Sequence, residues 1–388
     1  MERVEGVLRA LALLVGLAVV AGYLAFLYRR LVVAPDAPRV VRRVVLGVLA
    51  VGGVVFVAAA ALLRNGDPDP VRPLLWLGMT EIALALYLTL GLLLLGLVVL
   101  PLSLARRSGT RLRVLRVGTP AVVALSLAVT GYGLVEAARP GVVEHEVSSP
   151  RLPAPFDGVR VVLLTDLHVG PLHDASWARR AVGMVEAQRP DLVVLGGDLV
   201  DGSVEEVGDY LAPLADLDAP LGVVFVTGNH ELMGGEAEAL EWVDEFERLG
   251  VDVLRNESVA LTRDGATIAL AGVDDPTGTG ALAPDPDAAL AGVPDDAFTI
   301  WVSHQPRQGP PGGRADLQLS GHTHGGQLWP VQLLVPLFDP TVAGRDDRDG
   351  VTVITSRGFG TSGPPVRVLA PPAIDVVTLR RDPEGEND

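Results

Sequence analysis

Four long apolar runs occupy the first third of the chain. They cover residues 10–28, 44–63, 82–105 and 117–135, and none of them contains a charged residue. A helix of about 20 apolar residues is long enough to cross the hydrocarbon core of a bilayer. The alternative is a set of buried helices in a soluble domain, but four such runs leave no polar faces to meet water. Residues 1–138 therefore predict a transmembrane region with four spans.

Two details of this region bear on its interpretation. Arginines follow the first run where a cleaved signal peptide would carry small residues, so we expect this run to remain in the protein. Glu81 lies at the edge of the third run, and an acid inside a membrane can mark an ion path. No partner charge occurs in the other runs, which favours a place for Glu81 at the membrane interface and argues against ion transport.

The arginines between the runs predict the orientation. The first loop has five arginines against one acid, and the third has five against none. The second loop has two arginines, Arg64 and Arg72, which are offset by Asp67, Asp69 and Glu81. Because positively charged loops stay in the cytoplasm, loops one and three are predicted inside. The N-terminus and everything after Val135 are then predicted outside, in an extracytoplasmic position.

The pattern changes after Glu136. Prolines at positions 140, 150, 153 and 155 predict an extended linker over residues 139–155. Short β-branched runs then alternate with helical stretches, which is typical of an α/β domain, here over residues 156–381 before an acidic tail, 382–388. Helices are expected over 177–188 and 236–249. Strands are expected over 159–164, 192–195, 223–226, 267–273, 299–302, 317–320, 351–355 and 374–379.

Charge and cysteine content exclude several classes of protein. Residues 1–140 carry 15 arginines and 7 acids, whereas residues 141–388 carry 16 arginines and 40 acids. So acidic a domain repels a nucleic-acid backbone, and no nucleic-acid partner is expected. The chain has no cysteine, which excludes disulfides, thiol nucleophiles and cysteine-ligated metals.

Polar side chains follow five of the expected strands. The segments read TDLH at 165–168, GGDLVD at 196–201, TGNHE at 227–231, SHQP at 303–306 and SGHTHGGQ at 320–327. Five of the seven histidines in the chain lie in these segments. Because α/β sheets bind ligands outside the carboxyl ends of their strands, we expect one shared site.

The residue types in these segments indicate metal binding. Imidazole and carboxylate together suit Mn, Fe, Zn or a similar divalent ion. The Asp-x-His and His-x-His spacings place alternate side chains on one face of an extended segment. Two ions about 3.5–4 Å apart need a bridging ligand, for which a carboxylate is suited. No other cofactor is expected.

These five segments, in this order, resemble the calcineurin-like metallophosphoesterase superfamily. The segments SGHTHGGQ (320–327) and GVDDP (272–276) are similar to those of the subgroup that contains the bacterial YkuE and YaeI proteins. The arrangement of several spans before the enzyme domain is similar to that of the transmembrane metallophosphoesterase-domain proteins. The resemblance implies a domain of two mixed β-sheets sandwiched by helices. It also implies two metal ions and assigns their ligands. The first ion would take Asp166, His168 and His324, the second Asn229, His304 and His322, and Asp198 would bridge them.

The resemblance further implies a catalytic role for His230, which would not bind metal but would protonate the leaving group. Two small departures are Glu231, where many members have Asp, and Ala373, where the subgroup often has Glu. The expected enzyme is a membrane-anchored hydrolase of phosphoester, phosphodiester or pyrophosphate bonds, with attack by a metal-bridging hydroxide. Lipid-linked or cell-envelope compounds are the expected substrates, and the bilayer is the expected partner.

Two other functions were weighed. A non-catalytic receptor or scaffold for a phosphorylated ligand predicts missing metal ligands, and none is missing. A transport or signalling unit predicts paired charges within the spans, which are absent from the sequence.

Several further residues leave alternatives open. Asp201 orients a ligand histidine or has no role there. The pair Asp274–Asp275 favours a turn over a site role, and Arg357 and Arg367 favour surface ion pairs over phosphate contacts. The apolar stretch LWPVQLLVPLF at 328–338 favours a place in the core over a lip on the bilayer surface.

Overall fold

The computed structural model describes residues 2–63 and 68–382, with side chains from residue 11 onward. It divides into two compact units, which are described separately: a helical unit (Met1–Asn65 and Pro70–Tyr132) and a catalytic unit (Gly66–Asp69 and Gly133–Asp388). Arg64 and Asp67 of the second loop, and the acidic tail beyond Asp382, lie outside the described residues.

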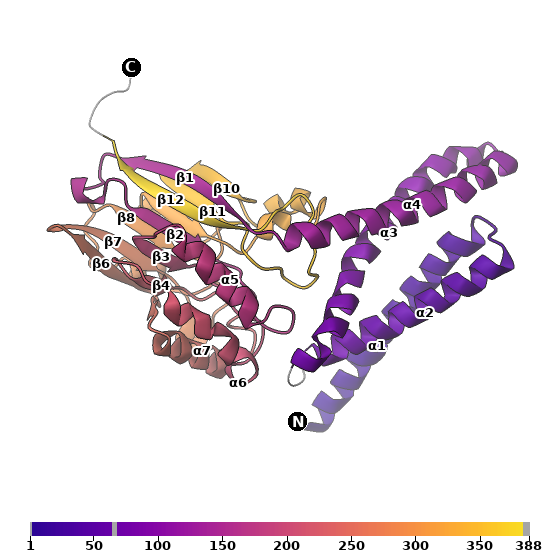
Figure 1. Cartoon of the computed structure of the whole chain (residues 1–388), viewed down its shortest axis with the longest axis horizontal. Helices are drawn as coiled ribbons and strands as arrows, with labels where there is room; N and C mark the ends of the chain where they lie inside the picture. Colours follow the sequence, from indigo (N-terminus) through magenta and orange to yellow (C-terminus); the bar gives the residue numbers. More distant parts are fainter. Residues whose placement is uncertain (1, 64–67, 383–388) are drawn as a thin grey trace, which may run out of the picture. The chain divides into compact units, whose positions relative to one another are not determined.

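Four long helices form the helical unit (Figure 1). They are α1 (Glu2–Tyr28, continued by a π-helix over Arg29–Val33), α2 (Arg39–Leu62), α3 (Arg72–Leu104) and α4 (Ser108–Ala137). All four are long and apolar enough to cross a membrane, as the apolar runs predicted. The helices exceed the runs in length because the arginine-bearing ends continue the same backbone hydrogen bonding.

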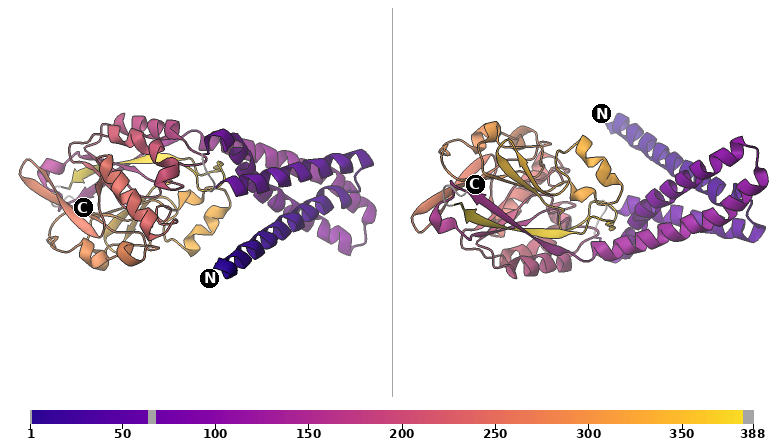
Figure 2. Two further views of the ribbon diagram at one scale, coloured as in Figure 1. Left: turned by 90° about the horizontal axis from the view of Figure 1, so that it is seen from below. Right: turned by 90° about the horizontal axis from the view of Figure 1, so that it is seen from above.

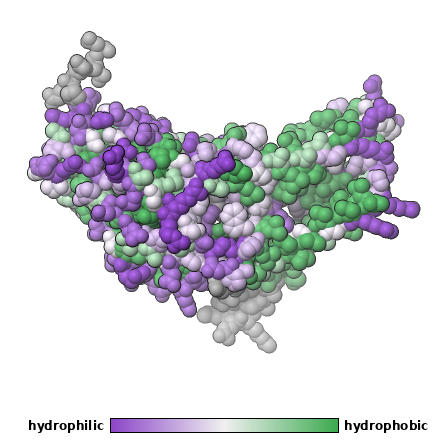
Figure 3. Space-filling view, in the orientation of Figure 1, coloured by the Kyte–Doolittle hydropathy of each residue, from purple (hydrophilic) through white to green (hydrophobic). Residues whose placement is uncertain are grey.

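The apolar side chains of this unit face outward. Only 6–28% of the residues in each candidate span are buried within the protein. Figure 3 shows apolar surface gathered over these helices. A helix that is apolar on its outer face has lipid as its natural solvent, so these surfaces fit a bilayer.

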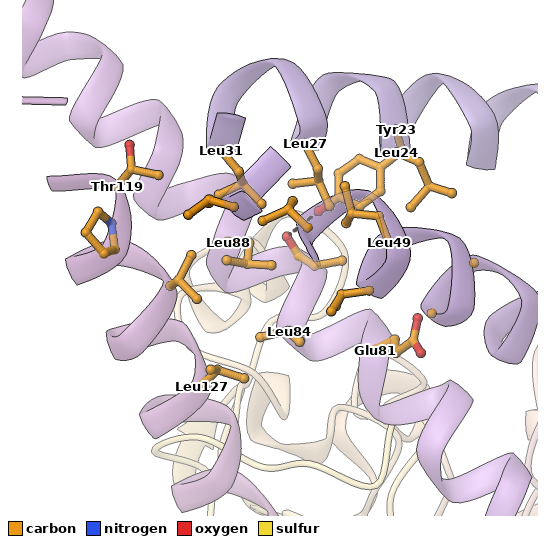
Figure 4. A pocket seen from close by; sticks show the side chains of 18 of the residues that line it. Tyr23, Leu24, Leu27, Leu31, Leu49, Glu81, Leu84, Leu88, Thr119 and Leu127 are labelled. Carbon is orange, nitrogen blue, oxygen red and sulfur yellow. Dashed lines mark hydrogen bonds between the residues drawn. The ribbon is translucent and has the colours of Figure 1, made fainter. Parts of the chain in front are cut away.

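Glu81, expected at the membrane interface, lies within helix α3 and not at its start. Helix α3 begins at Arg72, so Glu81 lies about 13 Å along it and opposite Gly52, near the middle of α2. It lines an apolar cavity of 1310 Å³ between the four helices, together with Tyr23 (Figure 4). The uncharged run begins after Glu81, but helix α3 extends ten residues further toward the N-terminus, back to Arg72. Within the described residues, no basic side chain pairs with it.

Two six-stranded sheets form the catalytic unit. The first has the order β1-β12-β2-β3-β4-β5 and the second β10-β11-β9-β8-β7-β6. The first sheet comprises β1 (Gly141–Ser149), β12 (Ala373–Arg381), β2 (Arg160–Leu164), β3 (Leu192–Leu195), β4 (Val223–Phe225) and β5 (Asp252–Val253). The second comprises β10 (Gly344–Arg348), β11 (Val351–Thr355), β9 (Leu317–Ser320), β8 (Thr299–Val302), β7 (Ala266–Gly272) and β6 (Glu257–Arg263).

Both sheets have a parallel centre. Strands β2 to β5 run parallel, as do β7, β8, β9 and β11, while β12, β6 and β10 pair antiparallel with β2, β7 and β11. One apolar core lies between the sheets and joins residues such as Leu163 and Val194 to Leu270 and Ile300. Helices α5 (Ala175–Glu186) and α7 (Glu236–Arg248), with the short α6 (Val204–Val207), cover the outer face of the first sheet. The short helix α8 (Pro286–Ala289) packs on the second.

This architecture confirms the expected α/β domain with two mixed sheets. The central strands are buried on both faces, so their sequences read as continuous apolar runs whose ends could be placed within one or two residues. Their parallel carboxyl ends place the polar segments of both sheets at one edge. Figure 2 shows the strands and the helices that cover them from two further sides.

The linker expected over residues 139–155 is wrong for most of its length. Residues Gly141–Ser149 form β1, which pairs in parallel with β12 over nine positions. Glu144, His145 and Glu146 made this segment read as polar, but it is an edge strand in which only alternate side chains turn inward. Only residues 138–140 separate α4 from β1. The short or polar strands β5, β6 and β10 were also missed.

Candidate metal centre

The proposed site residues follow the carboxyl ends of five strands. Asp166 and His168 follow β2, Asp198 follows β3, and Asn229 and His230 follow β4, all in the first sheet. His304 follows β8, and His322 and His324 follow β9, in the second sheet. The shared edge of the two sheets therefore carries one cluster, as the spacing predicted.

The first group of ligand atoms comes from Asp166, His168 and His324, which are buried and lie within 4.8 Å of one another. His168 Nε2 lies 3.0 Å from His324 Nε2, and His324 Nε2 lies 3.2 Å from Asp166 Oδ1. Because His168 Nδ1 donates to Asp201, the Nε2 lone pair of a neutral His168 is directed into this group, where it could bind a cation.

The second group comes from Asp198, His304 and His322 and has the same 4.8 Å span. His304 Nε2 lies 3.1 Å from Asp198 Oδ2 but makes no hydrogen bond with it. Asp198 is also within 4.8 Å of His168 and His230, so its carboxylate reaches both groups. Asn229 precedes His230, whose backbone N–H donates to Asp198 Oδ1 at 2.8 Å.

Unpartnered polar atoms provide a test of whether metal fits here. Asn229 Oδ1 and His304 Nε2 are buried and have no hydrogen-bond partner. Buried polar atoms in folded proteins are almost always paired, since an unpaired one costs about 1–3 kcal/mol. Both atoms belong to the set expected to bind the second ion. The donor set of carboxylate, amide oxygen and imidazole therefore fits divalent metal.

The backbone is unusual at the proposed ligands. Asp166, His168, Asp198, His322 and His324 all have φ between 49° and 70°, in the left-handed region. Each such non-glycine residue costs on the order of 1–2 kcal/mol, and such strain clusters at functional sites. Gly321 is required beside them, because a side chain there would collide with the Asp166 carboxylate. The backbone conformation that directs these side chains inward therefore lowers the stability of the fold.

The electrostatics of the cluster leave the carboxylates charged. Burial alone would raise the pKa of Asp166 and Asp198, but the neighbouring imidazoles outweigh it and hold both pKa values low. Burial lowers the pKa of His324 to about 4 against the opposing charge of Asp166. Ionised carboxylates and a neutral imidazole are the forms that bind metal.

Asp201 orients two histidines at once. Its Oδ1 accepts hydrogen bonds from His168 Nδ1 at 3.0 Å and from His230 Nδ1 at 2.5 Å. Burial would lower the pKa of His230, but the hydrogen bond to Asp201 and the charge of Asp198 raise it to about 9. Sequence reasoning left the role of Asp201 open; in the structure it hydrogen-bonds His168, one of the proposed ligands, and His230.

Glu231 has a structural task that the sequence did not reveal. Its buried carboxylate accepts from the backbone N–H groups of Asp198, Leu199 and Gly228 at 2.7–3.0 Å. It thereby ties the loop after β3 to the loop after β4.

The pair Asp274–Asp275 forms a turn, as favoured, because Asp275 Oδ1 accepts from the backbone and hydroxyl of Thr277. The two remaining histidines lie outside the cluster, with His145 bonded to Asp375 and His173 to Thr361.

The expected surface pairing is wrong for Arg367. It is fully buried, donates to backbone carbonyls of its own loop, and lies 3.1 Å from His324 Nδ1 through Nη2. Arg357 is half-buried beside Gly325, and no described side chain pairs with its guanidinium.

Comparison with known proteins agrees with this geometry. The calcineurin-like phosphoesterase family matches residues 159–326. A transmembrane protein with metallophosphoesterase domain from Danio rerio is 34% identical over 264 residues, which cover 64% of this chain and 60% of that protein. An uncharacterized metallophosphoesterase from Aquifex aeolicus is 33% identical and covers 62% of this chain and 91% of the relative. The uncharacterized metallophosphoesterase YkuE of Bacillus subtilis is 30% identical over 64% of this chain and 90% of its own length.

The fold and the candidate ligand groups define a metallophosphoesterase domain, which follows the apolar helices in the chain. The chain belongs to the calcineurin-like metallophosphoesterase family, and it is a hydrolase. The four apolar helices, together with the transmembrane relatives, identify a membrane protein.

Proposed function

We propose that the chain binds two divalent ions and hydrolyses phosphoester, phosphodiester or pyrophosphate bonds of lipid-linked or cell-envelope substrates. The observation that carries this proposal is the place of Asp198, whose carboxylate lies within 4.8 Å of ligand atoms in both groups. Asp166, His168 and His324 would hold the first ion, Asn229, His304 and His322 the second, and Asp198 would bridge. Ions held there would activate a water for attack and polarise the phosphoryl oxygens.

The side chains around this centre supply the remaining chemistry. His230, protonated and held by Asp201, is placed to donate a proton to the leaving oxygen. Arg357 lies beside Gly325, the residue after His324, and we propose that its guanidinium contacts a phosphate oxygen. The rival function, a non-catalytic phospho-ligand receptor, predicts a degraded site and is disfavoured because every ligand position is filled.

An exposed apolar segment supports a lipid-linked substrate. Leu333, Leu337 and Phe338 are 71–73% exposed, so the preference for a core position of residues 328–338 is wrong. Pro330 and Pro336 break the segment into single 3-10 turns (Val331–Leu333 and Val335–Leu337), which cannot bury a continuous face. We call residues 329–338 the apolar lip.

The apolar lip begins five residues after His324 and ends beside the cluster. Asp339, the next residue, places Oδ2 3.8 Å from His322 Nε2. The lip contains no charged side chain and includes Trp329, a residue type that favours the membrane interface. A lipid surface is therefore the partner that fits the lip, and it would deliver a substrate headgroup to the site.

Charged residues introduced into the apolar lip should reduce the hydrolysis of lipid-linked substrates but not of soluble ones. In full-length protein in liposomes, Leu337→Asp with Phe338→Asp is expected to lower kcat/KM about tenfold or more for a lipid-linked phosphodiester, because apolar contact with the bilayer is lost. Hydrolysis of a soluble chromogenic phosphodiester should stay unchanged. The control is Val142→Asp, an exposed apolar position on β1. Equal kinetics of the lip variant and the control on both substrates would contradict the lipid-linked proposal.

We further propose that the catalytic unit lies outside the cytoplasm, on the arginine distribution of the loops. The chain lacks cysteine, so single cysteines can be placed without background. In cells with the outer envelope opened, an impermeant thiol reagent should label Asp349→Cys, an exposed turn of the catalytic unit, but spare Ser108→Cys in the third loop. The reverse labelling pattern would place catalysis in the cytoplasm.

A further inference from the structure

Arg367 is the largest buried polar side chain near the proposed ligands. Its Nη1 donates to the His324 carbonyl at 3.1 Å, and its Nη2 lies 3.1 Å from His324 Nδ1. Nε and Nη2 donate to the Gly360 carbonyl at 3.0 and 2.7 Å, and the remaining bonds go to carbonyls of its own loop. No carboxylate pairs with it directly within the described part of the chain. A buried cation without a paired anion is costly, so it is rarely present only as filler.

The bonds of Arg367 converge on the first ligand group. Gly360, whose carbonyl accepts twice, donates its own N–H to the Asp166 carbonyl at 2.7 Å. Arg367 thus holds the backbone of His324, lies against its ring and, through Gly360, supports the backbone of Asp166. Groups that orient metal ligands in this way typically change metal affinity or activity 10–100-fold when they are removed.

The backbone around Arg367 is bound to the last turn of α4. Arg367 N donates to the Gly133 carbonyl at 3.0 Å, and Ala370 N donates to Glu136 Oε1 at 2.9 Å. Gly133 leaves no room for change, because a Cβ there would lie 2.5 Å from Val366 Cγ1 and 2.8 Å from the Arg367 carbonyl oxygen. Residues 133–137 therefore belong to the catalytic unit although they end the fourth apolar helix.

We infer that Arg367 is a positioning residue for His324 and that the end of α4 sets its place, so that the first metal site depends on this helix end. The inference rests on the proposed role of His324 as a metal ligand. It predicts a specific signature: disturbing the α4 end weakens metal binding at the first site and leaves the second intact. A merely structural link would lower the melting temperature instead and leave metal affinity unchanged.

Two glycines of α4 provide a matched test. A Cβ at Gly131 meets nothing within 4 Å, whereas one at Gly133 collides with the Arg367 backbone. Full-length Gly133→Ala and Gly131→Ala proteins, stripped of metal, would be titrated with Mn²⁺ by EPR, with hydrolysis of a chromogenic phosphodiester followed in parallel. In Gly133→Ala, one of two Mn²⁺ ions should bind about 10–100-fold more weakly, and excess Mn²⁺ should restore kcat. Gly131→Ala should match the wild type.

Arg367→Lys is the second variant, because it keeps the charge but cannot reach both His324 and Gly360. It should show the same selective loss at one site. Wild-type affinity in both Gly133→Ala and Arg367→Lys would overturn the inference, as would equal losses in Gly133→Ala and Gly131→Ala. A lower melting temperature with unchanged Mn²⁺ affinity would also overturn it. Failure of the wild type itself to bind two ions would instead contradict the proposed function.

Discussion

Replacement of Asp198 by alanine is expected to strip at least one metal ion from the protein and to abolish hydrolysis. Asp198 lies within 4.8 Å of His168 of the first group and of His304 and His322 of the second. Its Oδ1 also accepts from the His230 backbone, so alanine would disturb that loop as well. Asp198→Asn keeps an oxygen for this bond and removes only the charge. Loss of metal in both variants would therefore identify the charge as the cause.

Elemental analysis and phosphodiester hydrolysis would measure both outcomes. Asp191→Ala is the control, since Asp191 precedes the opposite end of β3 and pairs with Arg263. It should retain metal and turnover. Two ions per chain with surviving activity in Asp198→Ala would show that another residue bridges the ions.

Replacement of His230 by alanine is expected to lower kcat by about 10²–10⁴-fold while both ions stay bound, because proton donation to the leaving group is lost. His230 is 19% exposed at its side chain and is oriented by Asp201, as a group that meets substrate should be. Its ring also lies within reach of His168 and Asp198, so the geometry alone permits a ligand role. The number of metal ions bound by His230→Ala distinguishes a proton donor from a metal ligand.

A substrate with a better leaving group provides the sharper measurement. If His230 protonates the leaving oxygen, the loss in His230→Ala should shrink for a nitrophenolate leaving group, which needs no proton. His173→Ala is the control, a buried histidine that stacks on Trp177 outside the cluster. Loss of one ion in His230→Ala, or an equal loss of kcat for all leaving groups, would contradict the assigned role.

The central strands and the site at their ends could be predicted because both follow from local pattern. A strand buried on both faces reads as a short apolar run, and Asp198 and His304 come directly after such runs. His322 and His324 are separated by one residue, and this spacing indicates metal binding. The sequence therefore shows which side chains meet, although the left-handed backbone that directs five of them inward leaves no mark beyond the adjacent glycines.

The features that were missed depend on long-range contacts. Strand β1 has polar residues at its centre and is recognisable only by its pairing with β12. Arg367 reads as a surface charge, but the tertiary fold encloses it between carbonyls of its own loop and His324, 43 positions away. The apolar lip reads as core because composition does not reveal that two prolines prevent it from packing. In each case the local sequence is compatible with two environments, and tertiary structure selects one.

The most direct test of the account is the metal content of the full-length protein, determined together with its hydrolysis of phosphodiesters before and after chelation. The account predicts two divalent ions per chain, loss of hydrolysis when they are removed, and recovery when Mn²⁺ or a similar ion is returned. Hydrolysis that persists in metal-free protein, or a fully active protein with a single ion per chain, would contradict it.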